Sequence, residues 1–161
     1  MAKFTHLDNE GRVRMVDVTD KKPTVREAVA EGSVFMSSET FDLIRNQKVK
    51  KGNVLETARI AGIMAAKKTS ALIPMCHPLN ITHVQIDFTP DKTQRCIGIE
   101  ATVRIIDQTG IEMEALTAVC VAALTIYDMC KSYDKEMSIS KIQLLKKTGG
   151  KSGTFQRKQS D

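Results

Sequence analysis

The chain has 161 residues, of which 42% are hydrophobic and 27% are charged, which suits one soluble domain with an aliphatic core. Aromatic residues make up only 4% and tryptophan is absent, which argues against the base-stacking surfaces of single-strand nucleic-acid binders. The formal net charge of +5 fits either a phosphate-bearing partner or an ordinary solvated basic surface.

The first half of the chain predicts an arm, a strand and two helices. Residues 1–20 are interpreted as an irregular N-terminal arm. Small or apolar residues alternate with polar ones over 25–36, so we interpret this segment as a strand, although its Ala and Glu content also suits a helix. Ser37 and Asn53 are typical N-cap residues, the first of a short helix and the second of a helix that runs to about residue 70.

The second half predicts a hairpin, a long apolar helix and a last strand. Alternating apolar residues mark strands at 84–88 and 97–105. The helix expected from about residue 112 to 133 is apolar around almost its whole circumference, which is typical of a helix buried in a core or an interface. A further strand is expected near 139–144.

This order of elements predicts an α+β fold of the ferredoxin-like (split βαβ) type, with one extra helix and an antiparallel sheet packed by helices. We expect the N-terminal arm over 1–20, a single catalytic domain over 21–150 and a polar C-terminal tail, prone to disorder, over 151–161. Because a fold does not name a function, the site residues must do so.

The sequence predicts a cytoplasmic protein without a cofactor. The first residues lack the apolar run of a secretory signal, and the longest apolar stretch, 115–126, is short for a bilayer span. The four cysteines are not spaced as a zinc site, and three of them lie in apolar patterns. We therefore expect no membrane contact and no resident metal, while a metal that assists with phosphate groups stays open.

Three local patterns could carry chemistry, and each also has an ordinary structural interpretation. Asp128 and Lys131 stand one helical turn apart and could move protons in steps, or could be a surface ion pair. Lys51 precedes a helix N-terminus, where a phosphate is favoured, but it also suits a solvated loop. His77 lies on a loop stiffened by prolines and could contact a heterocycle or only hydrogen-bond to backbone.

Three longer segments are much more specific: 73–79 (IPMCHPL), 110–117 (GIEMEALT) and 123–131 (ALTIYDMCK). Together they closely resemble the cyclic pyranopterin monophosphate synthase family, the C protein of molybdenum cofactor synthesis, and the likeness covers roughly residues 14–153. That family converts 3′,8-cyclo-7,8-dihydroguanosine 5′-triphosphate into cyclic pyranopterin monophosphate and releases pyrophosphate. The resemblance therefore implies a lyase that acts on a small-molecule nucleotide.

The resemblance also implies a role for each matched position. It places acid–base catalysis on Asp128 and Lys131, with Lys51 as the other catalytic lysine. The substrate-binding positions that it implies are Met75, Cys76, His77, Glu112, Met113, Glu114, Arg26, Lys147 and Asp17. The basic members of this set suit the triphosphate, because charge-assisted hydrogen bonds are strong, and a glutamate could accept from a guanine-type N–H edge.

The long helix further predicts a site shared between two chains. Glu112 and Lys131 are nineteen positions apart, or roughly 28 Å along a helix that rises about 1.5 Å per residue, which exceeds the length of the substrate. The resemblance implies a homohexamer, a trimer of dimers, and a two-fold axis would pair one end of the helix with the opposite end of its twin.

Two interpretations without chemistry stay open. A non-catalytic ferredoxin-like module that binds RNA or a metabolite fits the basic charge, but Phe88 is the single candidate stacking ring in the predicted hairpin. A purely structural oligomer built on the apolar helix would make the charged residues incidental. We favour the enzyme and expect no nucleic acid among its partners.

Overall fold

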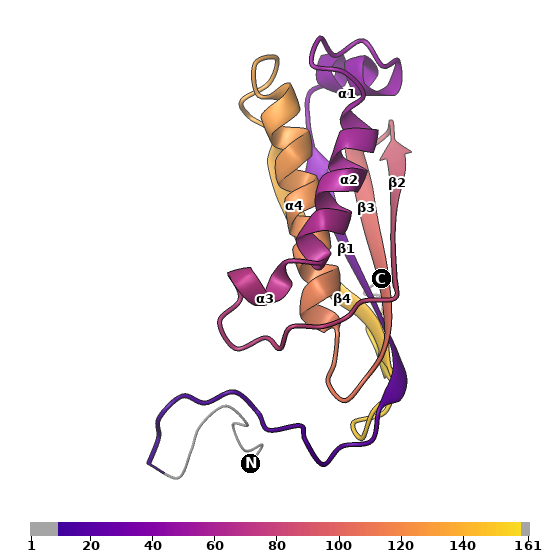
Figure 1. Cartoon of the computed structure of the whole chain (residues 1–161). Helices are drawn as coiled ribbons and strands as arrows, with labels where there is room; N and C mark the ends of the chain where they lie inside the picture. Colours follow the sequence, from indigo (N-terminus) through magenta and orange to yellow (C-terminus); the bar gives the residue numbers. More distant parts are fainter. Residues whose placement is uncertain (1–9, 159–161) are drawn as a thin grey trace.

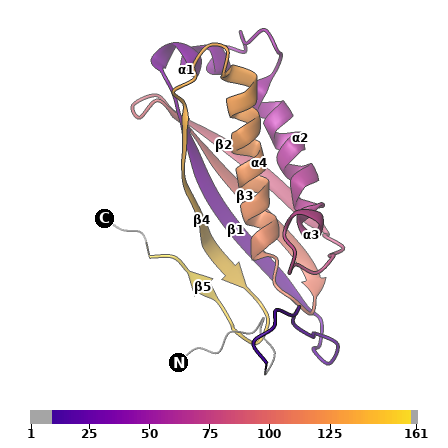
Figure 2. The same ribbon diagram turned by 90° about the vertical axis from the view of Figure 1, so that its left-hand side faces the viewer.

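The computed structural model describes residues 10–158 and contains one antiparallel sheet with its helices on one face (Figures 1 and 2). In chain order the elements are β1 (Thr24–Phe35), α1 (Ser38–Arg45), α2 (Val54–Ala66), α3 (Thr69–Leu72), β2 (His83–Asp91), β3 (Cys96–Asp107), α4 (Glu112–Cys130), β4 (Ser138–Thr148) and β5 (Phe155–Gln156). The strand order is β2-β3-β1-β4-β5, and every neighbouring pair is antiparallel. This arrangement confirms the predicted ferredoxin-like α+β class.

Small residues let the helices pack closely on the sheet. Along β1, Ala28, Ala30 and Val34 are fully buried beneath the helices, as the alternation predicted. A Cβ at Gly62 of α2 would lie 2.9 Å from the carbonyl oxygen of Ala118, so α2 and α4 approach each other to backbone distance. The two helices consequently run side by side across the sheet in both views (Figures 1 and 2).

The opposite face of the sheet carries charged side chains instead of a second layer of helices. Glu27 of β1 accepts a hydrogen bond from Arg104 at 2.6 Å and another from Lys146 at 3.2 Å. These two hydrogen bonds hold the pKa of the Glu27 carboxyl below its ordinary value, and the bond from Arg104 has the larger effect. Cross-strand pairs of this kind stabilise a sheet whose outer face meets solvent.

The predicted N-caps are confirmed, whereas two predicted ends are wrong. The side chain of Ser37 accepts a hydrogen bond from the backbone N–H of Thr40, and that of Asn53 accepts one from Glu56. The helix expected to reach residue 70 ends at Ala66, where the chain turns into α3. The apolar helix ends at Cys130 and not near residue 133.

The polar residues near the C-terminus are more ordered than their composition indicated. β5 pairs with β4 through Phe155 and Gln156, and the backbone N–H of Arg157 donates to the carbonyl of Leu145 at 2.7 Å. Composition does not show a strand partner, because the partner lies on another segment. Residues 1–9 of the predicted arm and residues 159–161 of the predicted tail lie outside the described residues.

By length and hydropathy alone, α4 could cross a membrane, unlike the shorter stretch considered from the sequence. It is instead the central helix of the core: 56% of its apolar window is buried against the sheet and α2. The core helix of a soluble protein passes the same composition test.

Candidate active site

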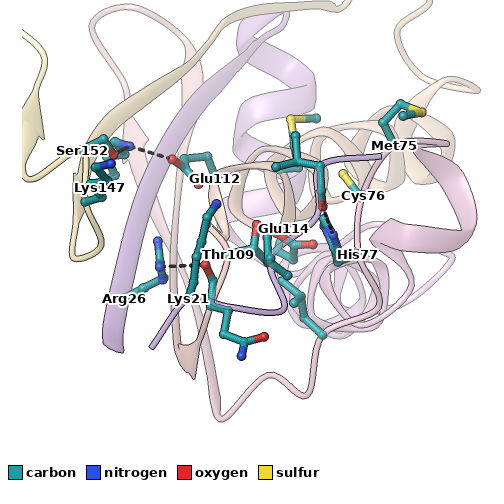
Figure 3. A pocket seen from close by; sticks show the side chains of 17 residues that line it. Lys21, Arg26, Met75, Cys76, His77, Thr109, Glu112, Glu114, Lys147 and Ser152 are labelled. Atoms are coloured by element: carbon teal, nitrogen blue, oxygen red, sulfur yellow. Dashed lines mark hydrogen bonds and ion pairs between the residues drawn. The ribbon is translucent and has the colours of Figure 1, made fainter. Parts of the chain in front are cut away.

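A cavity of about 420 Å³ opens at the N-terminal end of α4 (Figure 3). Its walls come from the N-terminal arm, β1, the loop after α3, the turn that leads into α4, the first turn of α4, and the turn after β4. Eight of the nine substrate-binding positions implied by the resemblance line it: Arg26, Met75, Cys76, His77, Glu112, Met113, Glu114 and Lys147. The pocket thus assembles residues that are up to 136 positions apart in the sequence, from Val16 to Ser152.

One side of the pocket is cationic. The guanidinium of Arg26 donates from Nε to the carbonyl of Asp107 and from Nη2 to that of Gln108, both at 2.9 Å. Lys147 Nζ lies 3.3 Å from Glu112 Oε1 and donates to Ser152 Oγ at 2.6 Å. Figure 3 shows these groups together on one side of the cavity. Fixed guanidinium and ammonium groups in a concave site are suited to phosphate oxygens.

The turn after β4 closes this cationic side. Gly149 and Gly150 have φ of 88° and 72°, a left-handed conformation that glycine adopts without steric cost. A Cβ at Gly150 would overlap the guanidinium of Arg26. The turn therefore needs glycine there in order to reach the pocket, where Lys151 and Ser152 join the lining.

The other side of the pocket is formed by the Met75–His77 loop and a buried carboxyl (Figure 3). Glu114 is only 2% exposed, and burial raises the pKa of its carboxyl from 4.5 to about 7. A hydrogen bond from its own backbone N–H opposes this rise, while the charge of Glu112 adds to it. A carboxyl of this kind can accept from an N–H edge when ionised and can donate a proton when neutral.

His77 is held by the N-terminal arm. Its Nε2 lies 2.9 Å from the carbonyl oxygen of Val16, so this nitrogen carries the hydrogen in the neutral ring. Burial raises the pKa of the neighbouring Cys76 thiol, and the charge of Glu114 adds to the effect. A thiol of raised pKa is a poor nucleophile at neutral pH, so Cys76 is suited to contact and not to attack.

The three predicted catalytic residues form a separate group at the C-terminal end of α4, called here the Asp128 cluster: Lys51, Asp128 and Lys131. Lys131 Nζ lies 2.7 Å from Asp128 Oδ1, and Lys51 Nζ lies 3.7 Å from Oδ2. Lys51 Nζ also donates to the backbone carbonyl of Asp128 at 2.9 Å. The hydrogen bond from Lys131 and the two ammonium charges lower the pKa of the Asp128 carboxyl, and Asp128 in turn raises the pKa of Lys131.

The pocket and the Asp128 cluster lie at opposite ends of one helix. α4 has 19 residues, so its ends are roughly 27 Å apart at about 1.5 Å per residue. Figure 1 shows one end of α4 on the side of the molecule where the arm lies and the other end beside α1. A single chain therefore does not bring the two groups of predicted site residues together.

The structure also adds residues to the site and leaves one out. Asp17 does not line the cavity although its neighbours Val16 and Val18 do; its carboxylate instead accepts from the backbone N–H and the hydroxyl of Thr19 at 2.9 and 2.7 Å. The lining residues that sequence reasoning missed are Val16, Val18, Lys21, Leu79, Gln108, Thr109, Gly110, Lys151 and Ser152. For the last two a signal was available, because the GGKSG run stands out in the sequence.

Within residues 10–158, no group of three or more His, Cys, Asp or Glu side chains could hold a metal ion.

Comparison with known proteins gives matches along nearly the whole chain. The model of the MoaC family matches residues 15–150. The cyclic pyranopterin monophosphate synthase of Desulforapulum autotrophicum is 65% identical over 155 residues, which cover 96% of this chain and 95% of the relative. The enzymes of the same name from Desulfatibacillum aliphaticivorans and Chloroflexus aurantiacus are 64% and 59% identical, each over 96% of this chain and over 98% and 95% of the relative.

Proposed function

Because this chain belongs to the MoaC family, as its motifs indicated, we propose that it makes cyclic pyranopterin monophosphate in the pocket at the N-terminal end of α4. It is an enzyme of molybdenum cofactor biosynthesis, a lyase, and its substrate is a small molecule. The observation that carries the assignment of the pocket is its division into a cationic side and a side with a buried carboxyl. We place the reaction in the cytoplasm.

The cationic side suits the triphosphate of the cyclic guanosine substrate. Arg26 is oriented by two backbone carbonyls, so it loses little conformational freedom when it binds a phosphate. Lys147, paired with Glu112 in this structure, can turn its ammonium toward a phosphate oxygen. Lys21 and Lys151 line the same cavity and add positive charge for the pyrophosphate that leaves.

The opposite side suits the guanine-derived ring. Glu114 lies deep in the wall, where its ionised carboxylate accepts hydrogen bonds from a guanine-type amino and N–H edge. Met75 and Met113 supply apolar surface for the ring, and His77 supplies a polar ring nitrogen. This division assigns different tasks to the two glutamates: Glu112 holds a phosphate-binding lysine, whereas Glu114 recognises the base.

The acid–base steps are assigned to the Asp128 cluster. Opening and rebuilding the base requires protons to be added and removed, and closure of the phosphate ring requires a sugar hydroxyl to lose its proton as it attacks the α-phosphorus. Asp128 can accept a proton, and Lys131 and Lys51, which both lie at hydrogen-bond or ion-pair distance from Asp128, can donate one. The bond from the α-phosphorus to the bridging oxygen then breaks, and pyrophosphate leaves toward the cationic side.

These assignments require a second subunit, because one α4 separates the pocket from the Asp128 cluster. Exposed apolar side chains on the helical layer favour such an association: Ile60 and Met64 of α2 are 63% and 46% exposed, and Leu124 of α4 is 57% exposed. We propose that a two-fold axis places the Asp128 cluster of one chain beside the pocket of its twin, within a homohexamer that is a trimer of dimers.

The first experiment is direct turnover. The purified protein is incubated with 3′,8-cyclo-7,8-dihydroguanosine 5′-triphosphate, and the products are identified by mass analysis. Equal amounts of cyclic pyranopterin monophosphate and pyrophosphate are expected. Tight binding without either product would favour a metabolite-binding module instead.

The second experiment tests the shared site by mixing inactive subunits. Co-refolding Glu114→Ala chains with Lys131→Ala chains gives mixed pairs in which one of the two pockets has both intact halves. Random pairing should therefore restore about a quarter of wild-type activity. The matched control mixes Asp128→Asn with Lys131→Ala, which lie at the same helix end, and should stay inactive. No recovery in the first mixture, with subunit exchange demonstrated, would place the whole site within one chain.

A further inference from the structure

The turn that carries Lys51 is anchored at its base but its tip is exposed. The backbone N–H of Gly52 donates to the carbonyl of Val49 at 3.0 Å, and Val49 is only 5% exposed. Lys50 and Lys51 are the two central residues of this turn, and both are exposed. The position of the Lys51 ammonium therefore depends on where the backbone of the turn is held, because the lysine stem itself is long and flexible.

A tyrosine from the segment after α4 holds this turn. The backbone N–H of Lys50 donates to the phenolic oxygen of Tyr133 at 3.2 Å, across 83 positions of sequence. Tyr133 is in turn fixed to the end of α4, because its own backbone N–H donates to the carbonyl of Cys130 at 2.8 Å. The hydroxyl thus joins the turn that bears Lys51 to the helix end that bears Asp128.

We propose that Tyr133 is a positioning residue for Lys51, which sets the ammonium against Asp128; this rests on the proposed catalytic role of the Asp128 cluster. Lys51 makes two contacts with Asp128, one with the backbone carbonyl at 2.9 Å and one with the carboxylate at 3.7 Å. Both depend on the distance between the turn and the helix end, which the hydroxyl of Tyr133 sets. Without its hydroxyl, Tyr133 would have no oxygen to accept the hydrogen bond from the backbone N–H of Lys50.

The test is Tyr133→Phe, which removes only the hydroxyl from a side chain that is 40% exposed in the subunit. A displaced catalytic group can cost up to about a hundredfold in rate for about 1 Å of movement. We expect kcat to fall about tenfold or more, with KM changed less than about twofold and the unfolding transition close to that of the control.

The matched control is Tyr127→Phe, which removes a hydrogen bond of the same length, 3.2 Å, from the tyrosine hydroxyl to the carbonyl of Lys135. That bond holds the same segment after α4 but does not involve the turn of Lys51. An equal fall of kcat in the two variants, or a wild-type kcat in Tyr133→Phe, would overturn the positioning role.

A second readout does not depend on turnover. The carboxyl of Asp128 is titrated by carbon-13 NMR in the wild type and in both variants. In Tyr133→Phe its pKa should rise toward the ordinary value, because the Lys51 ammonium moves away, whereas Tyr127→Phe should leave it unchanged. An unchanged pKa in Tyr133→Phe would refute the positioning role even if the wild type made no product. Absence of product from the wild type would instead count against the proposed function.

Discussion

Glu114 should make the stability of this protein fall as the pH rises from about 5 to 8, and Glu114→Gln should remove that fall. The side chain is 2% exposed, and burial raises the pKa of its carboxyl from 4.5 to about 7. In this interval the folded chain holds a proton on Glu114 that the unfolded chain has released. The free energy of unfolding therefore decreases with rising pH, beginning near pH 4.5 and levelling off above pH 7.

The size of the effect follows from the two pKa values. At about 1.4 kcal/mol for each tenfold change in proton affinity, the difference corresponds to about 3 kcal/mol. Water reaches the open pocket and screens the ionised carboxylate, so we expect the free energy of unfolding to change by about 2 kcal/mol over this pH range. Glutamine has nearly the shape of the protonated acid and no titratable proton, so the variant should lack this slope.

The assay is urea unfolding followed by circular dichroism at pH 5, 6, 7 and 8. Protein concentration is kept constant, because association changes apparent stability. The informative quantity is the difference between the variant and the wild type at each pH, since it cancels the titration of all other groups. Relative to the wild type, the free energy of unfolding of the variant should increase by about 2 kcal/mol between pH 5 and pH 8. Parallel pH profiles would refute the buried, proton-holding state of Glu114.

Three further outcomes are expected. Asp128→Asn and Lys131→Ala should each lower kcat by about a hundredfold or more, measured by product formation, while KM changes little. The unfolding midpoint should also change little, because both side chains are exposed. A triple alanine variant of the thiols outside the pocket lining should change the urea midpoint more than kcat; these thiols are Cys96, Cys120 and Cys130. Gly62→Ala should lower the free energy of unfolding in urea by about 1–3 kcal/mol, because the added Cβ would lie 2.9 Å from a carbonyl oxygen of α4. The control is Gly98→Ala, whose Cβ would meet its nearest atom at 3.4 Å, so it should lower the free energy of unfolding less.

Much of the fold could be predicted because its signals are local. A period of two places Ala28, Ala30 and Val34 on one face of β1, and this alternation needs only the residues themselves. The N-caps Ser37 and Asn53 act within three residues of their partners, so their helices begin where expected. The family could also be identified from short motifs, because each one is contiguous in the sequence.

Interactions between distant segments decided what the sequence left open. β5 exists because Phe155 pairs with Lys147, and a polar stretch does not show which strand it will join. The cationic side of the pocket depends on the pairing of β1 with β4, which sets Lys147 opposite Ala28, two positions from Arg26. Strand register and helix packing determine such distances, and neither is written in any one segment.

The electrostatic state of the site was likewise a property of the tertiary structure. The sequence by itself shows two glutamates in one helical turn, but only burial distinguishes Glu114, whose pKa rises to about 7, from Glu112, which pairs with Lys147. The sequence also shows Asp128 and Lys131 one turn apart, whereas the approach of Lys51 depends on a loop 77 positions away. Desolvation and charge pairing act through space, so the order of residues along the chain does not determine them.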